Sequence, residues 1–423
     1  MNEHMPSAAA KSAITEEMQV RCCVAGGGPA GMMLGFLLAR AGVEVIVLEK
    51  HADFFRDFRG DTIHPSTLEL MYELGLLDAF LQVPHQTLQE AGGVIGDETF
   101  LLADLSHLPT HCKYIALMPQ WDFLNFLAKQ AKPYPTFHLK MEAEVTDLLW
   151  EGEQVVGVRA TTPQGELVVH ADLVIGADGR HSVVRERAHL EIMDLGAPID
   201  VLWLRLPKEP TDPTRSLGYV KAGRILILID RGDYWQSGVV IPKGKFAEIR
   251  QQGLASFQAD LVNHAPFLAG RVETIESWDA VKLLTVRVDR LRQWYRPGLL
   301  CIGDAAHAMS PVGGVGINLA IQDAVATANV LAEKLGAGPV AAEDLAQVQQ
   351  RRAWPTRMTQ GLQLLIHKRL LRPALQEESV ALPVYVRWLL RIPWLRRIPA
   401  RIIGIGFRPE HVQTPEIRQE QRL

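Results

Sequence analysis

Residues 20–50 read VRCCVAGGGPAGMMLGFLLARAGVEVIVLEK, and the order of their apolar and glycine-rich runs decides the fold. The two apolar runs are typical of buried parallel strands, and the stretch between them predicts a glycine turn followed by a helix. In this turn Gly26 permits the tight bend, Gly28 lets a ligand approach the main chain, and Gly31 lets the helix pack close to the sheet. The helix N-terminus offers free N–H groups to an anion. These features predict a βαβ unit that binds a dinucleotide.

An acidic residue ends the second of these predicted strands. Glu49 follows the glycine turn by about twenty residues, the spacing at which a carboxylate accepts hydrogen bonds from the two hydroxyls of a ribose. We include the neighbouring Lys50 in the same expected site. The alternative is a glycine-rich turn that binds no ligand.

A second turn follows the predicted strand in DLVIGADGRHSVVRE, residues 172–186. Its glycines tighten the turn, and Asp178 and Ser182 have side chains suited to capping the helix that follows. Capping alone is therefore one interpretation of this motif. The other interpretation is that the turn takes part in binding the ligand.

A third glycine-rich stretch, CIGDAAHAMSPVGGVGINLAIQDA, occupies residues 301–324, between an apolar run and the pattern of an alanine-rich helix. Glycine is costly in regular structure, so its repetition here indicates that a ligand comes close to the main chain. Asp304 can accept hydrogen bonds from a polyol, and residues 311–316 can lie flat against a planar ring. The helix expected from about Ile317 points its positive end at that ring, which stabilises a ring that becomes anionic on reduction.

Together, the three motifs resemble those of the FAD-dependent aromatic hydroxylases of the para-hydroxybenzoate hydroxylase type, over about residues 20–370. The resemblance implies a bound FAD, with the first motif and Glu49 at its ADP half and Asp304 at its ribityl chain. It also implies transient binding of NAD(P)H as reductant and transfer of oxygen from O2, through a flavin hydroperoxide, to an aromatic or quinone-like substrate. Arg59 and Gln120 stand at positions where the family has further cofactor contacts.

The expected cofactor-binding residues come from the three motifs and from the positions that the resemblance assigns. They are Gly26, Gly28, Pro29, Ala30, Gly31, Glu49, Lys50, Arg59, Gln120, Asp178, Gly303, Asp304, Pro311, Gly314, Gly316, Ile317 and Asn318. Asp178 is preferred to Ser182, because the family associates the acid at this position with both flavin and nicotinamide binding. We expect no metal site, and we assign no catalytic base.

Several further residues have both a functional and a structural interpretation. His307 is either a proton-transfer group or a structural part of its turn, and Arg185 either contacts NAD(P)H or forms a salt bridge within its domain. His64 precedes a predicted helix and is expected to be a local cap. The unranked candidates for walls of a substrate pocket are Trp203, Arg205 and Tyr219.

The sequence of elements predicts an α/β fold, in which a Rossmann-like FAD-binding domain is intertwined with an antiparallel β-sheet substrate domain. Residues 1–18 are expected to be a flexible tail, and residues 371–423 a C-terminal helical segment. The two domains share the rest of the chain, the FAD-binding domain with residues 19–90, 112–195 and 285–370 and the substrate domain with residues 91–111 and 196–284.

The composition of the chain argues against several classes of protein. The formal net charge of −4 argues against a nucleic-acid-binding protein, and the four cysteines form no CxxC pair that would indicate a zinc ribbon or a dithiol centre. These features favour a cytoplasmic enzyme. Two rivals remain, a flavin-dependent reductase or saturase of prenyl-type substrates and a non-catalytic flavin redox sensor. Substrate-stimulated, oxygen-dependent oxidation of NAD(P)H with a hydroxylated product would separate them from a monooxygenase.

The C-terminal stretch LPVYVRWLLRIPWLRRIPARIIGIGFRP, residues 382–409, contains six arginines and two tryptophans but no acid. Basic amphipathic helices with tryptophan bind well at an anionic membrane surface, which predicts peripheral membrane contact. The alternative is a helical cap on the catalytic unit. The sequence has no run of eighteen apolar residues, so we do not expect a membrane-spanning helix.

Overall fold

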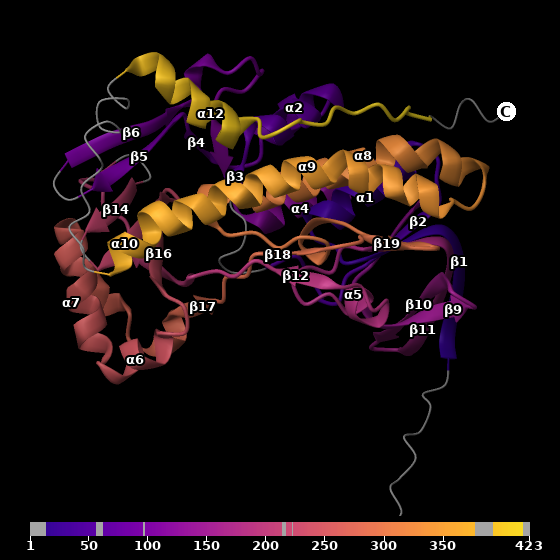
Figure 1. Cartoon of the computed structure of the whole chain (residues 1–423), viewed down its shortest axis with the longest axis horizontal. Coiled ribbons are helices and arrows are strands. Elements are labelled where there is room, and N and C mark those ends of the chain that lie inside the picture. The colour runs from indigo at the N-terminus through magenta and orange to yellow at the C-terminus, as the bar shows by residue number, and fades with distance from the viewer. Residues whose placement is uncertain are drawn as a thin grey trace, which may run out of the picture.

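The structure is a computed structural model, and it describes residues 14–55, 62–95, 98–213, 217–221, 223–376 and 392–417. It has the mixed α/β architecture that the sequence predicts. Figure 1 shows an elongated molecule with a β-sheet toward each end. Two long helices, α8 (Gly316–Ala337) and α9 (Ala342–Ile366), run along the molecule, and α9 reaches from one sheet to the other.

The first sheet is built around β1 (Ile14–Ala25), which pairs in parallel with β2 (Val45–Leu48) on one side and with β11 (Gly165–Gly176) on the other. The strand order is β19-β20-β11-β1-β2-β8, with the antiparallel meander β9–β10 attached to β11. β20 pairs in parallel with the end of β11, so the chain returns to this sheet after building the second one. The remaining strands of this sheet are β8 (Phe137–Lys140), β9 (Glu144–Glu151), β10 (Gln154–Thr162), β19 (Tyr295–Arg296) and β20 (Leu299–Cys301).

Helices cover the first sheet with their apolar sides. α1 (Pro29–Arg40) packs against α8 and α4 (Gln120–Ala131) and is buried along almost its whole length. The stretch Val312–Ala337 is long and apolar enough to cross a membrane, but 67% of its most apolar window is buried within the fold, which explains its composition. The shorter elements around this sheet are β3 (Thr62–Ile63), α2 (Pro65–Glu73), α3 (Leu77–Leu81), β4 (Gln86–Leu88), β7 (Ile115–Leu117), α5 (Val183–Arg187), β12 (Ile192–Asp194) and β18 (Asp289–Leu291).

The second sheet has the strand order β17-β13-β16-β15-β14-β5-β6. Its pairs are antiparallel as predicted, except that β14 and β5 run parallel, because β5 and β6 enter this sheet from a much earlier part of the chain. Helices α6 (Phe246–Gln251) and α7 (Leu254–His264) follow one another and are separated by Gly253, which has a φ of +92°. The elements are β5 (Glu90–Ile95), β6 (Glu98–Asp104), β13 (Ile199–Pro207), β14 (Leu217–Lys221), β15 (Arg224–Asp230), β16 (Tyr234–Pro242), α6 (Phe246–Gln251), α7 (Leu254–His264) and β17 (Lys282–Leu284).

The two faces of the second sheet have different neighbours. One face packs on α6 and α7 through a cluster that includes Trp235 and Phe257. The other face forms a cluster with Trp203, Leu371 and Val312, and Val312 belongs to the third glycine-rich stretch. The side chains on this second face therefore face the third glycine-rich stretch.

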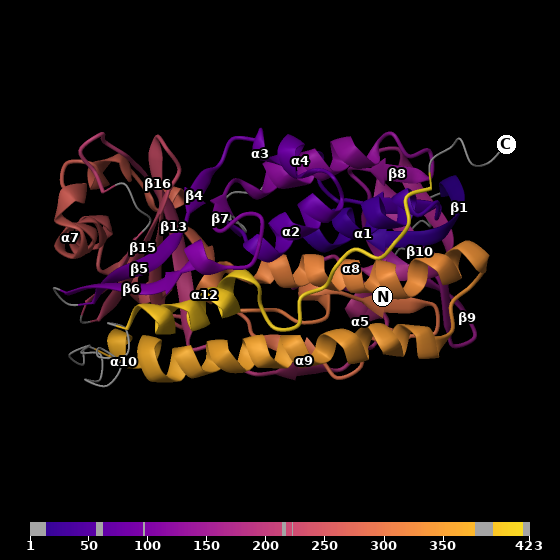
Figure 2. The ribbon, with the colours of Figure 1, turned by 90° about the horizontal axis from the view of Figure 1, so that it is seen from above.

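Both ends of the chain depart from expectation. β1 begins at Ile14, so residues 14–18 belong to the sheet and not to a flexible tail, because they pair with the long strand β11. The expected C-terminal segment is only partly helical. α9 continues as a π-helical turn (His367–Leu371) and α10 (Arg372–Leu375), and α12 (Arg397–Gly404) follows a short 3-10 turn. Residues 405–417 have no helix, and Figure 2 shows them crossing α8 from α12.

Candidate cofactor site

The first glycine motif forms the turn between β1 and α1. Gly26 has a φ of +106°, and a Cβ on it would lie 2.5 Å from the Ala177 carbonyl oxygen, while a Cβ on Gly31 would overlap the main chain of Gly26. The fold itself therefore requires both glycines. Gly28 differs, because a Cβ there would have no atom within 4 Å. An open space thus borders the main chain at the N-terminus of α1, where N–H groups can receive an anion.

Glu49 is held rigidly beside this turn. Its carboxylate accepts hydrogen bonds from the Gly27 N–H at 2.9 Å and from the His51 N–H at 3.1 Å, and the residue is only 8% exposed. The main chain of the turn thereby fixes the acid at the end of β2. Lys50, next to it, is exposed. The ribose contact expected of Glu49 remains a prediction.

The second motif lies directly against the first. Ser182 caps α5 by accepting a hydrogen bond from the Arg185 N–H at 2.9 Å, as the capping interpretation predicts. Asp178 accepts from the Val184 N–H through Oδ2, but its buried Oδ1 has no hydrogen-bond partner among the residues that the structure describes. Burial raises the pKa of Asp178 against the opposing effect of its hydrogen bonds. An unsatisfied buried acceptor beside an open turn is suited to receive a ligand hydroxyl.

Arg185 connects the second motif to the third. Its guanidinium donates to the carbonyl oxygens of Ala305 at 3.2 Å and Arg180 at 2.8 Å, lies 3.9 Å from Asp289, and is almost fully buried. These contacts favour the salt bridge within the domain over a contact with NAD(P)H.

The third motif follows β20 and leads into α8. Gly313 and Gly314 have φ values of +81° and +63°, and the Gly314 carbonyl accepts a hydrogen bond from the Thr62 hydroxyl at 2.8 Å. Gly316 begins α8, and a Cβ on it would again have no atom within 4 Å. The main chain is therefore open at the N-terminus of α8 as it is at that of α1.

Asp304 stands between these two openings, in the turn after β20. It is not isolated, because Arg180 of the second motif donates to its Oδ2 at 3.0 Å, and both side chains are about one quarter to one third exposed (27% and 30%). Arg180 belongs to the second motif but is not among the site residues expected from the sequence. A basic residue inside a glycine turn that faces an expected polyol ligand was the available signal.

Asn318 and His64 have other partners than the sequence suggested. The Asn318 side chain donates to the Thr62 carbonyl and accepts from the His64 N–H and the Thr67 hydroxyl, so a contact with cofactor would have to come from its main chain. His64 occupies the N-cap position of α2 as expected, but its side chain makes no capping bond. Instead its Nδ1 donates to the Ile403 carbonyl of α12 at 2.7 Å. Burial lowers the pKa of His64 to about 4, so the ring is neutral.

His307 is buried inside its turn and bonds to Asp323 of α8, with 2.5 Å between Nε2 and Oδ2. This contact favours its structural interpretation. The remaining expected residues lie along the same edge: Pro29, Ala30, Gln120, Gly303, Pro311 and Ile317 are all buried or partly buried at the starts of α1, α4 and α8 or in the turn after β20. Arg59 lies outside the described residues.

The candidates for a substrate-pocket wall lie on different faces of the second sheet. Trp203 belongs to the face that meets Val312, whereas Tyr219 packs on the opposite side, where its ring lies 6.4 Å from that of Phe267. Arg205 is exposed and lies over the ring of Tyr234. Trp203 is therefore well placed to line a space beside the third motif, and Tyr219 is not.

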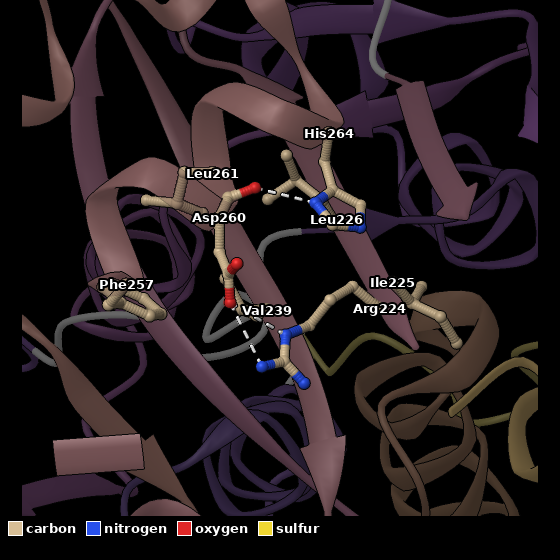
Figure 3. Close-up of a pocket in the computed structure, with 8 residues that line it drawn as sticks. All are labelled: Arg224, Ile225, Leu226, Val239, Phe257, Asp260, Leu261 and His264. Carbon is tan, nitrogen blue, oxygen red and sulfur yellow. Dashed lines mark hydrogen bonds and ion pairs between the residues drawn. The ribbon is translucent and has the colours of Figure 1, made fainter. Parts of the chain in front are cut away.

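A narrow pocket occurs on the far face of this sheet, between α7 and β15 (Figure 3). Its charged groups bind each other: Arg224 donates to the Asp260 carboxylate at 3.1 Å, and the His264 ring lies 2.7 Å from the Asp260 carbonyl oxygen. Because the pocket belongs to the face that packs on α7, it does not adjoin the glycine motifs. We do not assign the substrate to it.

The geometry can be compared with known proteins. Residues 19–360 match the family model described as FAD binding domain. The 6-methylpretetramide 4-monooxygenase of Streptomyces rimosus is 33% identical over 394 residues, which cover 90% of this chain and 91% of that protein. The 3-demethoxyubiquinol 3-hydroxylase of Escherichia coli (strain K12) is 26% identical over 321 residues, covering 73% of this chain and 78% of that one.

Solved structures agree in fold. The OxyS anhydrotetracycline hydroxylase from Streptomyces rimosus superposes with a TM-score of 0.70 at 23% identity, over 92% of this chain and 76% of that chain. The p-nitrophenol 4-monooxygenase PnpA from Pseudomonas putida DLL-E4 superposes with a TM-score of 0.70 at 20% identity, over 90% of this chain and 99% of that chain. The match over residues 19–360 and the 33% identity to a monooxygenase define a flavoprotein of the FAD-dependent monooxygenase class. The chain belongs to the FAD binding domain family.

Proposed function

We propose that this flavoprotein uses NAD(P)H and O2 to hydroxylate an aromatic or quinone-like small molecule through a flavin hydroperoxide. The observation that carries the proposal is the pair of open main-chain surfaces at Gly28 and Gly316, where an added Cβ would meet no described atom within 4 Å. The unsatisfied Oδ1 of Asp178 and the partly exposed Asp304 lie along the same motifs. These features fit an extended dinucleotide with a flat ring at the α8 end. The names of the relatives support the reaction class.

The protein's own groups would bind FAD and the substrate and orient them toward each other. FAD, when bound, supplies the redox chemistry and the activation of oxygen. The N-terminus of α8 would stabilise negative charge that develops on a ring placed against residues 313–316. The substrate would lie between this turn and the sheet face that carries Trp203, where apolar residues such as Val312 and Ile227 exclude water.

A product assay tests this function. The purified protein with FAD should oxidise NADH or NADPH faster when a phenolic or quinone-type substrate from a panel is added, and under 18O2 the product should gain one labelled oxygen atom in mass spectrometry. A reductase or saturase would instead give a product richer in hydrogen and no label. A redox sensor would show neither turnover nor product, and either result would refute the proposal.

We further propose that the enzyme works in the cytoplasm at the surface of an anionic membrane, held there by α12. Ile398 of α12 is 54% exposed, with Arg397 and Arg401 exposed on the same helix, and Trp394 in the preceding 3-10 turn is 61% exposed. The opposite side of α12 is buried through Ala400 and Gly404. The exposed side thus combines apolar and basic groups, which suits a lipid surface. The earlier part of the basic stretch, residues 382–391, lies outside the described residues.

Co-sedimentation with liposomes tests the membrane proposal. Wild-type protein should bind phosphatidylglycerol liposomes at low salt and bind neutral phosphatidylcholine liposomes much less, because each basic residue near an anionic surface contributes about 1 kcal/mol. Arg397→Glu with Arg401→Glu should abolish binding while FAD content is retained. Lys129→Glu with Lys132→Glu, an equal change of charge at exposed sites on α4, should leave binding intact. No binding by the wild type would leave α12 as a structural cap.

A further inference from the structure

A series of buried charged groups leads away from the third motif. Asp323 of α8 accepts hydrogen bonds from the Gly303 N–H at 3.1 Å and from the His307 ring, both through Oδ2, and its Oδ1 accepts from Arg352 Nε at 2.9 Å. Asp323 and Arg352 are fully buried. Although burial acts to raise it, His307 and Arg352 hold the pKa of Asp323 below its ordinary value. The carboxylate therefore stays charged and fixes both ends of the turn that carries Asp304.

The series ends in the extended segment, residues 405–417. Glu410 of this segment is 3% exposed, and its carboxylate lies 3.5 Å from Arg352 Nη1 and 2.6 Å from Arg351 Nη2. The Glu410 N–H also donates to the Gln322 side chain, one residue before Asp323. The segment thereby supplies the negative charge that the far side of the Arg352 guanidinium faces.

The positions of Asp323, Arg352 and Glu410 depend on one another because their charges must balance in a buried region. A buried guanidinium is costly unless acceptors satisfy it, and Arg352 Nη1 also donates to the Arg408 carbonyl of the same segment at 3.3 Å. With Glu410 present, Arg352 bridges two carboxylates and is held in one orientation. Without it, Arg352 would turn toward other partners, and Asp323 would lose the contact that keeps it aligned with the Gly303 N–H.

We propose that Glu410 is a positioning residue of the FAD site, which acts through Arg352 and Asp323 to hold the turn that presents Asp304. The extended segment is then a working part of the cofactor site although it follows the matched family region, which ends at residue 360. The inference rests on FAD binding and not on the proposed reaction, so it can be tested without a substrate.

The test compares two ways of disturbing the same segment. Glu410→Gln removes the charge from the series. Glu73→Gln of α2 instead weakens the anchor of the neighbouring residues, because the Glu73 carboxylate binds the His411 ring at 2.5 Å and the Val412 N–H at 2.8 Å. FAD dissociation constants would be measured by fluorescence titration of each apoprotein, together with its melting temperature.

Glu410→Gln should raise the Kd for FAD by about tenfold or more, which is the size of effect known for the outer partners of metal ligands. Glu73→Gln should lower the melting temperature but change the Kd by less than about twofold, and Glu410→Asp, which keeps the charge, should recover most of the affinity. If Glu410→Gln does not fold, Arg351→Gln, at a side chain 30% exposed, should raise the Kd in the same direction. Unchanged FAD affinity in the folded Glu410 or Arg351 variant, or an equal loss in Glu73→Gln, would overturn the proposal.

Discussion

Gly28→Val is expected to yield a folded protein that no longer binds FAD. A Cβ at this position would meet no described atom within 4 Å, and the φ of −74° is open to any residue, so we expect the apoprotein to accommodate valine. Valine is a poorer N-cap than glycine by about 1 kcal/mol, a small cost for a chain of this size. The branched side chain would fill the space expected for the pyrophosphate. Circular dichroism and FAD titration measure the two effects separately.

Gly31→Ala provides the contrast within the same motif. Its Cβ would overlap the Gly26 main chain, so this smaller substitution should destabilise or unfold the protein, whether or not FAD is present. A Gly28→Val protein that binds FAD normally would show that the open turn is not the pyrophosphate site. A stable Gly31→Ala protein would contradict the packing argument.

Asp304→Ala should weaken FAD binding by about 10- to 100-fold, because hydrogen bonds to a charged acceptor contribute about 1.5–3 kcal/mol each. The apoprotein should keep its melting temperature. The substitution removes an ion pair with Arg180 that is partly exposed, and such pairs contribute about 0–1 kcal/mol to stability. Isothermal titration of the apoprotein with FAD and a thermal melt give both quantities.

Arg180→Ala is the matched control for Asp304→Ala. It breaks the same ion pair but keeps the carboxylate, so any loss shared by the two variants belongs to the pair and any excess loss belongs to Asp304. Wild-type affinity for FAD in Asp304→Ala would remove this residue from the site.

Local patterns were sufficient to predict the parts of the fold that depend on neighbouring residues. The β1–α1–β2 unit and the start of α8 each follow from apolar periodicity and glycine placement within about thirty residues. The parallel pairing of β5 with β14 was not predictable in this way, because more than one hundred residues separate Gly93 from Gly218. Likewise, nothing near Ile14 in the sequence indicates that it pairs with Glu166.

In the candidate site, too, the contacts between residues far apart in the sequence could not be predicted. Glycines that the main chain requires could be recognised, but the sequence did not distinguish Gly31, which packs against protein, from Gly28, which faces open space. The ring of His64 bonds to a carbonyl more than three hundred residues later, so its local context suggested the wrong partner. An acid in the apolar pattern of α8 was a signal that Asp323 needs a buried cation, but only the structure identifies Arg352 as that cation.

The late return of β20 to the first sheet has a consequence for how the protein is made. While the ribosome translates residues 177–298, the edge of β11 that β20 will occupy remains open, although β1 and β2 have already emerged. Open strand edges bind other chains, so nascent molecules are exposed to aggregation throughout this interval. FAD held at Asp304 and Gly316, as we propose, would come too late to stabilise them, because both residues are translated only after the second sheet. Truncated products that stop before residue 299 should accordingly collect in the insoluble fraction even when cells are supplied with riboflavin.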